Sequence, residues 1–239
     1  MKRAYVTVLR AARAVLAATG LLRLLDAAAR RSRTALWVRS WLAIYDLDDM
    51  LALDVPWWTF AAADAVEDFL RARPGARVLE WGSGASTVWL ARRAGSVVTV
   101  EHDPAWAART AGGLAACDAG NVLLRVVEPR PGPGGVRSAK RGFEGLDFTA
   151  YADAVDDLDG HFDLVVVDGR AREACLERAV ERLAPGGWVV LDNVDRARYR
   201  DAVGVVDRRT PLRVRWTRGR TPALPYPTRT ALIALAEPS

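Results

Sequence analysis

Two glycines and two acids stand where predicted strands end, and their spacing suits a nucleotide-type ligand. Residues 78–87, Val-Leu-Glu-Trp-Gly-Ser-Gly-Ala-Ser-Thr, predict a short strand, a glycine turn and the start of a helix. Gly82 and Gly84 carry no Cβ, so the backbone can pass close to a ligand, and the N–H groups that open the helix can face an anion. Glu101, which ends the next predicted strand, can accept hydrogen bonds from both hydroxyls of a ribose. The alternative is a tight strand-to-helix turn that binds nothing.

Two residues of this stretch distinguish between cofactors. A dinucleotide fingerprint has a third glycine three residues after the second, and here that position is Thr87. Glu80 would set a negative charge against the pyrophosphate of NAD, whereas an acid there suits a ligand with a cationic amino group. The pattern Glu-x-Gly-x-Gly-x-x-Thr resembles motif I of the class I S-adenosylmethionine (SAM) methyltransferases. Residues 97–101 resemble the second strand of that family.

The resemblance implies that SAM is the cofactor and that residues around the turn and the second strand bind it. Glu80 would meet the methionine amino end, directly or through water, and Glu101 would bind the ribose. His102 would flank the adenine. The expected cofactor-binding residues are Glu80, Trp81, Gly82, Ser83, Gly84, Ser86, Thr87, Glu101 and His102.

Polar side chains near later predicted strands are the candidates for catalysis. Ligands of open α/β sheets bind outside the carboxyl ends of the strands, so Asp168 and Asp192 should lie near the glycine turn. In methyl transfer the protein supplies alignment and a dry site, with a base only to deprotonate a hydroxyl or an amine. Asp168 is the preferred base, because it follows a buried strand and faces the crevice. His161, which precedes that strand, is a second candidate, and a surface loop position is the alternative for it.

Asp168, Asp192 and Asn193 also form an oxygen-only donor set that suits Mg²⁺. A metal ion there can hold a substrate oxygen and lower its pKa. This set resembles that of the metal-dependent catechol-type O-methyltransferases, which take ligands from the same two strand ends. That family places a lysine base three residues after its first aspartate, and here the position is Ala171, which argues against catechol chemistry. Alternatively, Asp168 binds backbone amides while Asp192 and Asn193 cap the next helix.

The elements that must position these residues alternate between strand and helix from residue 77 onward. Such alternation predicts a parallel sheet with helices on both faces. The resemblance implies a doubly wound, mostly parallel, seven-stranded α/β sheet with an antiparallel last strand, and Leu-x-Pro-Gly-Gly over 183–187 adds to it. The expected strands are 77–81, 97–101, 121–127, 162–168, 188–192, 212–217 and 228–235, and the expected helices are 60–72, 86–94, 104–116, 148–158 and 171–183.

The chain divides into a helical N-terminal extension, 1–55, and a SAM-binding domain, 56–239. Residues 4–30 predict an amphipathic helix, with arginines that interrupt any apolar run long enough to span a membrane. The helical region is expected to continue over 40–53. The Pro/Gly-rich residues 128–145 predict a long loop that can fold over the substrate. Trp57 and Trp58 are expected either in the wall of the cofactor pocket or in the core.

Composition bounds the class of protein. A chain of 239 residues fits one domain with an elaborated end. Residues 1–45 carry nine basic side chains and one acid, and residues 196–220 carry nine basic side chains and two acids. These two basic segments could bind an anionic surface, such as a membrane or RNA. Alternatively, they are solvated faces of helices. The two cysteines have no metal or disulfide-framework spacing, which favours a reducing, cytoplasmic compartment.

The preferred function is a SAM-dependent methyltransferase that acts on a small molecule, at oxygen more than at nitrogen. An RNA methyltransferase is the first alternative, although the sequence has no Asn/Asp-Pro-Pro-Tyr/Phe box and no recognisable RNA-binding module. A non-catalytic SAM-fold protein at a membrane surface, anchored through the basic N-terminal helix, is the second. An NAD-dependent oxidoreductase is disfavoured by Thr87. The sequence leaves the methyl acceptor and the oligomeric state open.

Overall fold

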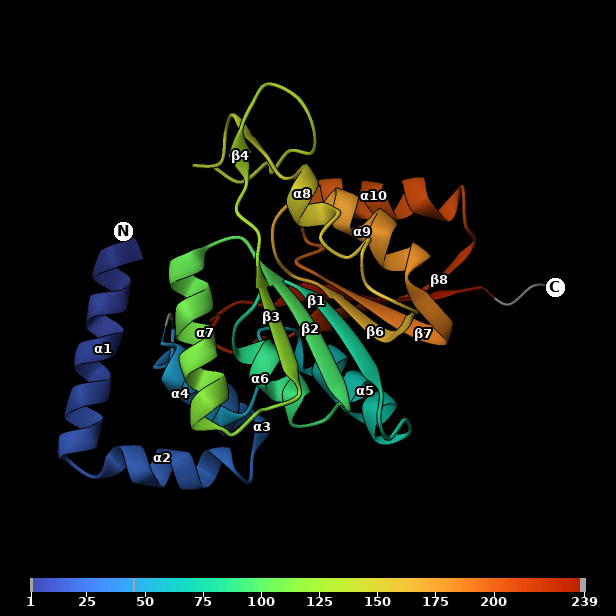
Figure 1. Ribbon diagram of the computed structural model, residues 1–239. Helices are drawn as coiled ribbons and strands as arrows, with labels where there is room; N and C mark the ends of the chain where they lie inside the picture. Colours follow the sequence, from blue (N-terminus) through green and yellow to red (C-terminus); the bar gives the residue numbers. More distant parts are fainter. Residues whose placement is uncertain (1, 45, 237–239) are drawn as a thin grey trace.

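The structure, a computed structural model, describes residues 2–44 and 46–236 of the chain. A seven-stranded sheet forms its centre, and helices cover both faces of the sheet (Figure 1). The strands are β1 Arg77–Trp81, β2 Ser96–Glu101, β3 Val122–Val126, β4 Arg130–Pro131, β5 Leu146–Asp147, β6 Phe162–Val167, β7 Leu183–Asp192, β8 Leu212–Gly219 and β9 Thr228–Leu235. The helices are α1 Lys2–Ala18, α2 Leu21–Ala29, α3 Arg33–Trp41, α4 Leu47–Leu53, α5 Phe60–Arg71, α6 Ala85–Ala91, α7 Pro104–Ala116, α8 Thr149–Ala152, α9 Arg172–Glu181 and α10 Ala197–Asp207.

The strand order in the sheet is β3-β2-β1-β6-β7-β9-β8. The first five of these strands run parallel, and β9 is antiparallel to both β7 and β8. The chain passes from β1 outward to β3 and then returns to β6 on the other side of β1, so a crevice forms at the carboxyl ends of β1 and β6. The fold predicted from the sequence is therefore confirmed.

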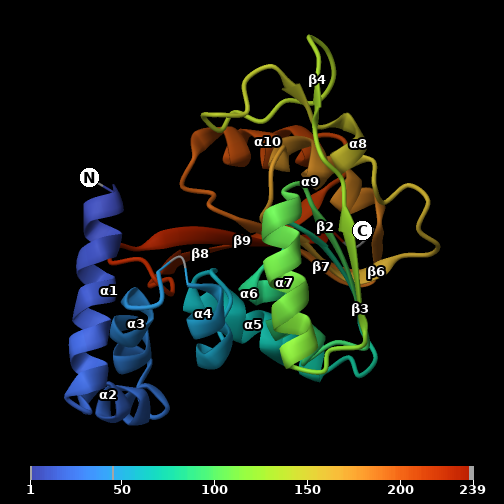
Figure 2. The same ribbon diagram turned by 60° about the vertical axis from the view of Figure 1, so that its left-hand side comes forward.

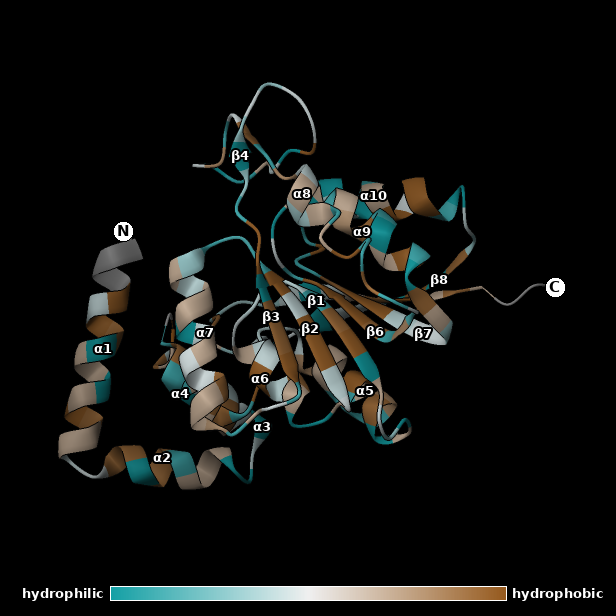
Figure 3. Cartoon of the chain, viewed as in Figure 1, coloured by the Kyte–Doolittle hydropathy of each residue, from teal (hydrophilic) through white to brown (hydrophobic). Residues whose placement is uncertain are grey.

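Both faces of the sheet are buried, which explains why its central strands are almost continuously apolar. Val78 and the other side chains of one face pack under α5 and α6. Leu79 and the side chains of the opposite face pack under α8, α9 and α10. Figure 3 shows the resulting hydrophobic colour along the strands. This packing fixes the carboxyl ends of the strands, where the candidate site residues lie.

The N-terminal extension contains four helices rather than two, over the described residues 2–44 and 46–55. Gly20, with φ of +75°, ends the first helix and separates α1 from α2, where one helix over 4–30 was expected. A second break falls between α3 and α4, and the Asp46 carboxylate caps α4 by accepting a hydrogen bond from Asp49 N–H. Arg39 of α3 forms a buried ion pair with Asp49, at 2.7 Å. Figures 1 and 2 show α1 and α2 as an L-shaped arm beside the body.

Three further details differ from the sequence-based expectation. The helix expected over 148–158 is a single turn, α8, followed by turns. The loop over 128–145 is mostly irregular, but β4 within it pairs with β5 in a short antiparallel ladder. Within the described residues no helix is long and apolar enough to cross a membrane. The division of the chain at residue 55 stays a prediction.

Candidate functional site

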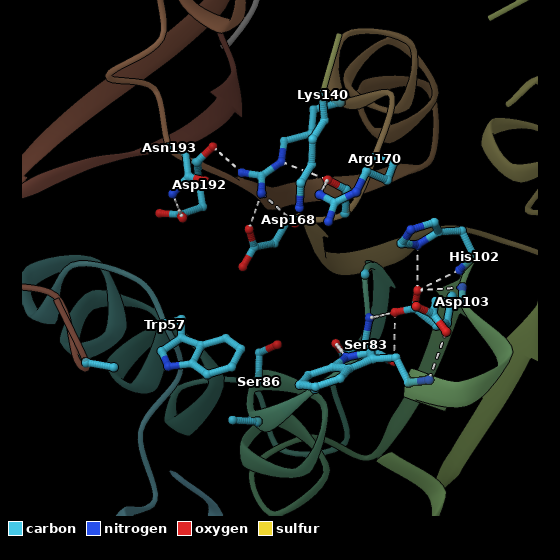
Figure 4. A pocket seen from close by; sticks show the side chains of 18 of the residues that line it. Trp57, Ser83, Ser86, His102, Asp103, Lys140, Asp168, Arg170, Asp192 and Asn193 are labelled. Carbon is cyan, nitrogen blue, oxygen red and sulfur yellow. Dashed lines mark hydrogen bonds and ion pairs between the residues drawn. The ribbon is translucent and has the colours of Figure 1, made fainter. Parts of the chain in front are cut away.

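A cavity of about 530 Å³ opens at the carboxyl ends of β1, β2, β6 and β7 (Figure 4). This volume lies in the range of small-molecule sites. Its wall combines the glycine turn after β1, the end of β2, residues 168–172 after β6, the end of β7, and residues 222–224 before β9. The topology therefore brings together segments that are far apart in the sequence.

The glycine turn forms the floor of the cavity. Gly82 has φ of +97°, and a Cβ there would lie 2.6 Å from the Cα of Gly169. Any side chain at this position would collide with the backbone that follows β6. Gly84 has φ of +154°, and its N–H donates to Thr87 Oγ1 at 2.9 Å. Because both positions need glycine, the turn keeps its backbone open towards the cavity.

Glu101 lines the cavity, as predicted, and its carboxylate already accepts several hydrogen bonds. One oxygen accepts from Ser83 N–H at 2.9 Å and Ser83 Oγ at 3.0 Å. The other accepts from the N–H groups of His102 and Asp103 at 2.7 and 3.0 Å, with His102 Nδ1 at 2.6 Å. Burial opposes ionisation, but His102 and these backbone donors outweigh it and lower the pKa of Glu101. Glu101 is therefore a fixed carboxylate at the end of β2.

Glu80 takes a different place from the one expected. Its side chain is fully buried and does not line the cavity. The carboxyl group accepts hydrogen bonds from Ser86 Oγ at 2.5 Å and Thr87 Oγ1 at 2.6 Å. Burial raises its pKa to about 7, although these hydroxyls and Thr99 act in the opposite direction. Glu80 thus fixes the first turn of α6 from below, and a direct contact with a ligand is not available to it.

Two other expected cofactor residues also lie in the interior. Trp81 is fully buried, and its Nε1 donates to the carbonyl oxygen of Tyr151 at 3.1 Å. Thr87 is fully buried against Glu80 and the turn. Neither side chain lines the cavity, whereas Ser83 and Ser86 do. The period of two in a strand explains the result for Trp81, because its side chain points into a covered face of the sheet.

Aromatic side chains surround the end of β2. His102 lines the cavity, and its ring centroid lies 5.3 Å from that of Phe143 in the 128–145 loop. Trp106 of α7 donates from Nε1 to the carbonyl oxygen of Ser83 at 2.7 Å and stacks with Trp57 at 6.4 Å. The rings of His102 and Trp106 line the same cavity as Glu101, and flat rings of this kind suit a planar base next to a ribose. Trp58, in contrast, belongs to the core.

Asp168 lines the cavity at the end of β6 and is paired with an arginine. Its Oδ1 lies 2.6 Å from Arg172 Nη2, and its side chain is 18% exposed. Burial raises the pKa of Asp168, while the charges of Arg172 and Arg170 act to lower it. A carboxylate with a raised pKa accepts a proton more readily at neutral pH. Asp168 is therefore a carboxyl group that lines the cavity at the end of β6 and is held there by Arg172.

The donor set predicted for Mg²⁺ does not fit a metal ion in this arrangement. Asp192 Oδ1 accepts from Thr230 Oγ1 at 2.7 Å, and Oδ2 accepts from the amide of Asn193. Burial raises the pKa of Asp192 to about 7, and the negative charge of Asp168 acts in the same direction. Across 2–44 and 46–236, no group of three or more His, Cys, Asp or Glu side chains could hold a metal ion. These carboxyl oxygens bind protein donors instead.

His161 lies away from the cavity. It immediately precedes β6, so it stands at the amino end of that strand, opposite the edge where the cavity opens. Its side chain is exposed, and its carbonyl oxygen accepts from Arg77 Nη1 at 3.2 Å. The position of His161 is that of a surface turn residue, and it has no route to a ligand in the cavity.

Several cavity residues were not singled out from the sequence. Arg172, Arg170 and Lys140 line the side of Asp168, and Ile44 lines the rim. Arg172 and Arg170 lie within four residues of Asp168, so their position just after a predicted strand end could have predicted that they line the cavity. Lys140 and Ile44 come from segments whose approach to the cavity depends on tertiary structure alone.

An apolar wall closes one side of the cavity. It consists of Ile44, Trp57 and residues 222–224. Helix α3 holds the 222–224 segment through hydrogen bonds from Trp37 Nε1 to the Leu224 carbonyl at 2.9 Å and from Ala223 N–H to Ser40 Oγ at 2.8 Å. The N-terminal extension is therefore part of the cavity, both directly and through the segment that it holds.

Comparisons with known proteins agree with this architecture. Residues 79–194 match the family model of a methyltransferase domain. An O-methyltransferase from Bacillus cereus, solved with S-adenosylhomocysteine (SAH), is 19% identical with a TM-score of 0.56, over 80% of this chain and 90% of that chain. An rRNA methylase from Streptococcus thermophilus is 13% identical with a TM-score of 0.51, over 72% of this chain and 95% of that chain. No curated protein matches.

The fold and the matched domain define the class of this protein. It has the class I methyltransferase fold, with the glycine turn and the acidic end of β2 at the expected edge of the sheet. Residues 79–194 form a methyltransferase domain, and the chain has the fold of the class I SAM-dependent methyltransferases. This class leaves the methylated atom and the acceptor to be inferred from the cavity.

Proposed function

We propose that this protein transfers the methyl group of SAM to a hydroxyl oxygen of a small acceptor with an apolar body. The observation that carries the proposal is the division of the cavity into two different halves. One half contains the glycine turn and Glu101, and the other contains Asp168 and the apolar wall around Trp57. A cofactor and an acceptor can therefore lie next to each other in one cavity.

The cofactor half fits SAM. Glu101 would bind the ribose hydroxyls, which take the place of the Ser83 hydroxyl and the His102 ring, the two donors that can rotate away. Ser83, Gly84 and Ser86 line the cavity beside the start of α6, where the methionine part would lie. Glu80 supports this part from below through Ser86.

The acceptor half favours oxygen chemistry on a molecule of limited size. Its apolar wall can cover an aromatic or aliphatic body, and Asp168 provides a proton acceptor at the opposite side. Bound SAM supplies a methyl group on a sulfonium sulfur, which leaves as a thioether. The acceptor hydroxyl loses its proton to the Asp168 carboxylate while its oxygen bonds to the methyl carbon and the carbon–sulfur bond breaks, with the electron pair left on sulfur. The proton then passes to solvent.

The test uses Asp168→Asn, which keeps the size of the side chain and a partner for Arg172. Removing a general base costs about 10²–10⁴-fold in kcat, so SAH release should fall by this factor with phenolic acceptors. SAH affinity, measured by calorimetry, should stay close to that of the wild type. A panel of phenols and the matching anilines separates oxygen from nitrogen transfer. Full activity of Asp168→Asn, or turnover with anilines alone, contradicts the proposal.

RNA is the second candidate acceptor, and the exposed arginines of β8 and of the turn before it favour it. These include Arg208, Arg209, Arg215 and Arg218. An RNA acceptor predicts binding that weakens steeply as salt increases. Retention of this protein on immobilised RNA at physiological salt, together with methyl transfer to RNA, would show that the acceptor is RNA and not a small molecule.

A peripheral membrane contact of the N-terminal arm is proposed separately, together with a cytoplasmic location. Val8, Val15, Leu21 and Leu24 expose 50–67% of their surface on α1 and α2, next to exposed arginines such as Arg23. Basic amphipathic helices of this type lie on anionic membranes. Flotation with anionic but not with neutral liposomes, lost on Leu24→Asp, is the expected result.

A further inference from the structure

The guanidinium of Arg172 lies between the two strand ends from which a metal ion would be held. Its Nη2 is 2.6 Å from Asp168 Oδ1, and its Nη1 donates to the carbonyl oxygen of Asp192 at 2.5 Å. Nε donates to the Gly169 carbonyl at 3.1 Å. The side chain of Arg172 is 4% exposed, so these contacts hold a fixed cation there. A divalent ion next to it would meet a like charge in a buried place.

A second cation reaches the same cavity from a different part of the chain. Lys140 belongs to the loop between β4 and β5, and Figure 4 shows its side chain pointing into the cavity on the side of Asp168. Phe143, three residues further on, packs against His102 at 5.3 Å and lies under the guanidinium of Arg170 at 5.4 Å. The loop is therefore anchored to the cavity wall close to Lys140.

The two cations differ in what they can do for a ligand. Most donors of Arg172 already bind backbone carbonyls or Asp168, so the role of Arg172 is structural. A lysine ammonium is a compact charge on a flexible stem and can follow a small oxyanion. Lys140 is one of two lysines in a chain whose other basic side chains, apart from two histidines, are arginines.

We propose that Lys140 holds the acceptor oxygen as an oxyanion in the acceptor half of the cavity, so that methyl transfer proceeds without a metal ion. The inference rests on the proposed function. The proton of the acceptor hydroxyl goes to Asp168, as above, and the ammonium of Lys140 stays protonated and donates a hydrogen bond to the oxygen. This contact lowers the pKa of an aromatic hydroxyl in the site, which defines the acceptor class as phenol-like.

The experiment measures the ionisation of a bound probe and needs no turnover. 4-Nitrophenol is titrated into the SAH complex across a pH series, and the absorbance of its phenolate reports the ionised fraction. An opposite charge within hydrogen-bonding reach favours ionisation about tenfold or more. The wild type and Lys140→Arg should raise the phenolate fraction by this factor over the free probe, and Lys140→Met should not. Arg141→Met, at the exposed neighbouring position, is the matched control.

The outcomes separate this inference from the proposed function. Failure of the wild type to bind SAH contradicts the proposed function itself. Normal SAH binding, with equal phenolate fractions in the wild type and Lys140→Met, overturns the inference, as does failure of the probe to bind at millimolar concentration. Binding of Mg²⁺ to the SAH complex with a further change in probe ionisation also overturns it. Lys140→Gln serves as a second neutral variant if Lys140→Met unfolds.

Discussion

Replacement of Glu80 by glutamine should make the protein more stable at high pH and leave its stability unchanged at low pH. The carboxyl group of Glu80 is fully buried, and burial raises its pKa from the ordinary 4.5 to about 7. The folded protein therefore keeps this proton in a pH range where the unfolded chain has lost it. Between about pH 4.5 and pH 7 the free energy of unfolding falls as pH rises, and above that range the loss is complete.

The magnitude follows from the two pKa values. At about 1.36 kcal/mol per pH unit, the separation between 4.5 and about 7 corresponds to about 3 kcal/mol. Glutamine cannot ionise, and the hydroxyls of Ser86 and Thr87 can accept as well as donate hydrogen bonds. Glu80→Gln should therefore match the wild type below pH 4.5 and exceed it by up to about 3 kcal/mol above pH 7, or about 6–12 °C in Tm.

Thermal and urea unfolding at a series of pH values measures this difference. The pKa of Asp192 is also raised to about 7, so its ionisation lowers the stability of the wild type and of Glu80→Gln alike as pH rises. The difference between their curves of stability against pH therefore isolates the contribution of Glu80. Glu128→Gln, at an exposed position, is the matched control for the removal of one carboxylate charge. Parallel curves for the wild type and Glu80→Gln would refute the assignment of Glu80 as a buried carboxyl group.

Three further substitutions test other parts of the structure. Gly82→Ala places a Cβ 2.6 Å from the backbone after β6, so it should cost about 1–3 kcal/mol of stability and weaken SAH binding, as calorimetry would show. Arg39→Met leaves two carboxylates without their buried partner and should destabilise by about 3–5 kcal/mol in urea unfolding. Trp37→Phe removes one hydrogen bond to the 222–224 segment, so amide exchange there should increase while SAH affinity stays unchanged.

The sequence was sufficient for the sheet and for the edge at which the cavity opens. Nearly continuous apolar runs such as 162–167 predict strands buried on both faces, and the alternation with helices predicts parallel pairing. The glycine turn and Glu101 could be recognised from the sequence because each depends on local structure. Gly82 lies where two backbone segments approach closely, and Glu101 lies at the end of a strand. Helix caps answer to local sequence in the same way, since Thr59 Oγ1 at the start of α5 accepts from Ala62 N–H at 3.3 Å.

The remaining features depend on long-range packing. Glu80 and Glu101 both lie at strand ends, but only the full structure shows that the hydroxyls of α6 cover the first of them. His161 was a candidate because histidine suits acid–base chemistry. It precedes the amino end of β6, however, and the cavity opens at the carboxyl end of that strand. Lys140 reaches the cavity through a Pro/Gly-rich loop, and a sequence of this composition carries no periodicity that would place it.

The most direct measurement of the central claim is calorimetric titration of SAH into the wild type and Glu101→Ala, with NAD as the comparison ligand. The wild type should bind SAH at one saturable site and give no binding heat with NAD. Loss of the hydrogen bonds to a charged carboxylate should cost Glu101→Ala about 2 kcal/mol, or about thirtyfold in Kd. Equal SAH affinity of the two proteins, or saturable heat with NAD alone, would contradict the assignment of this cavity as a SAM site.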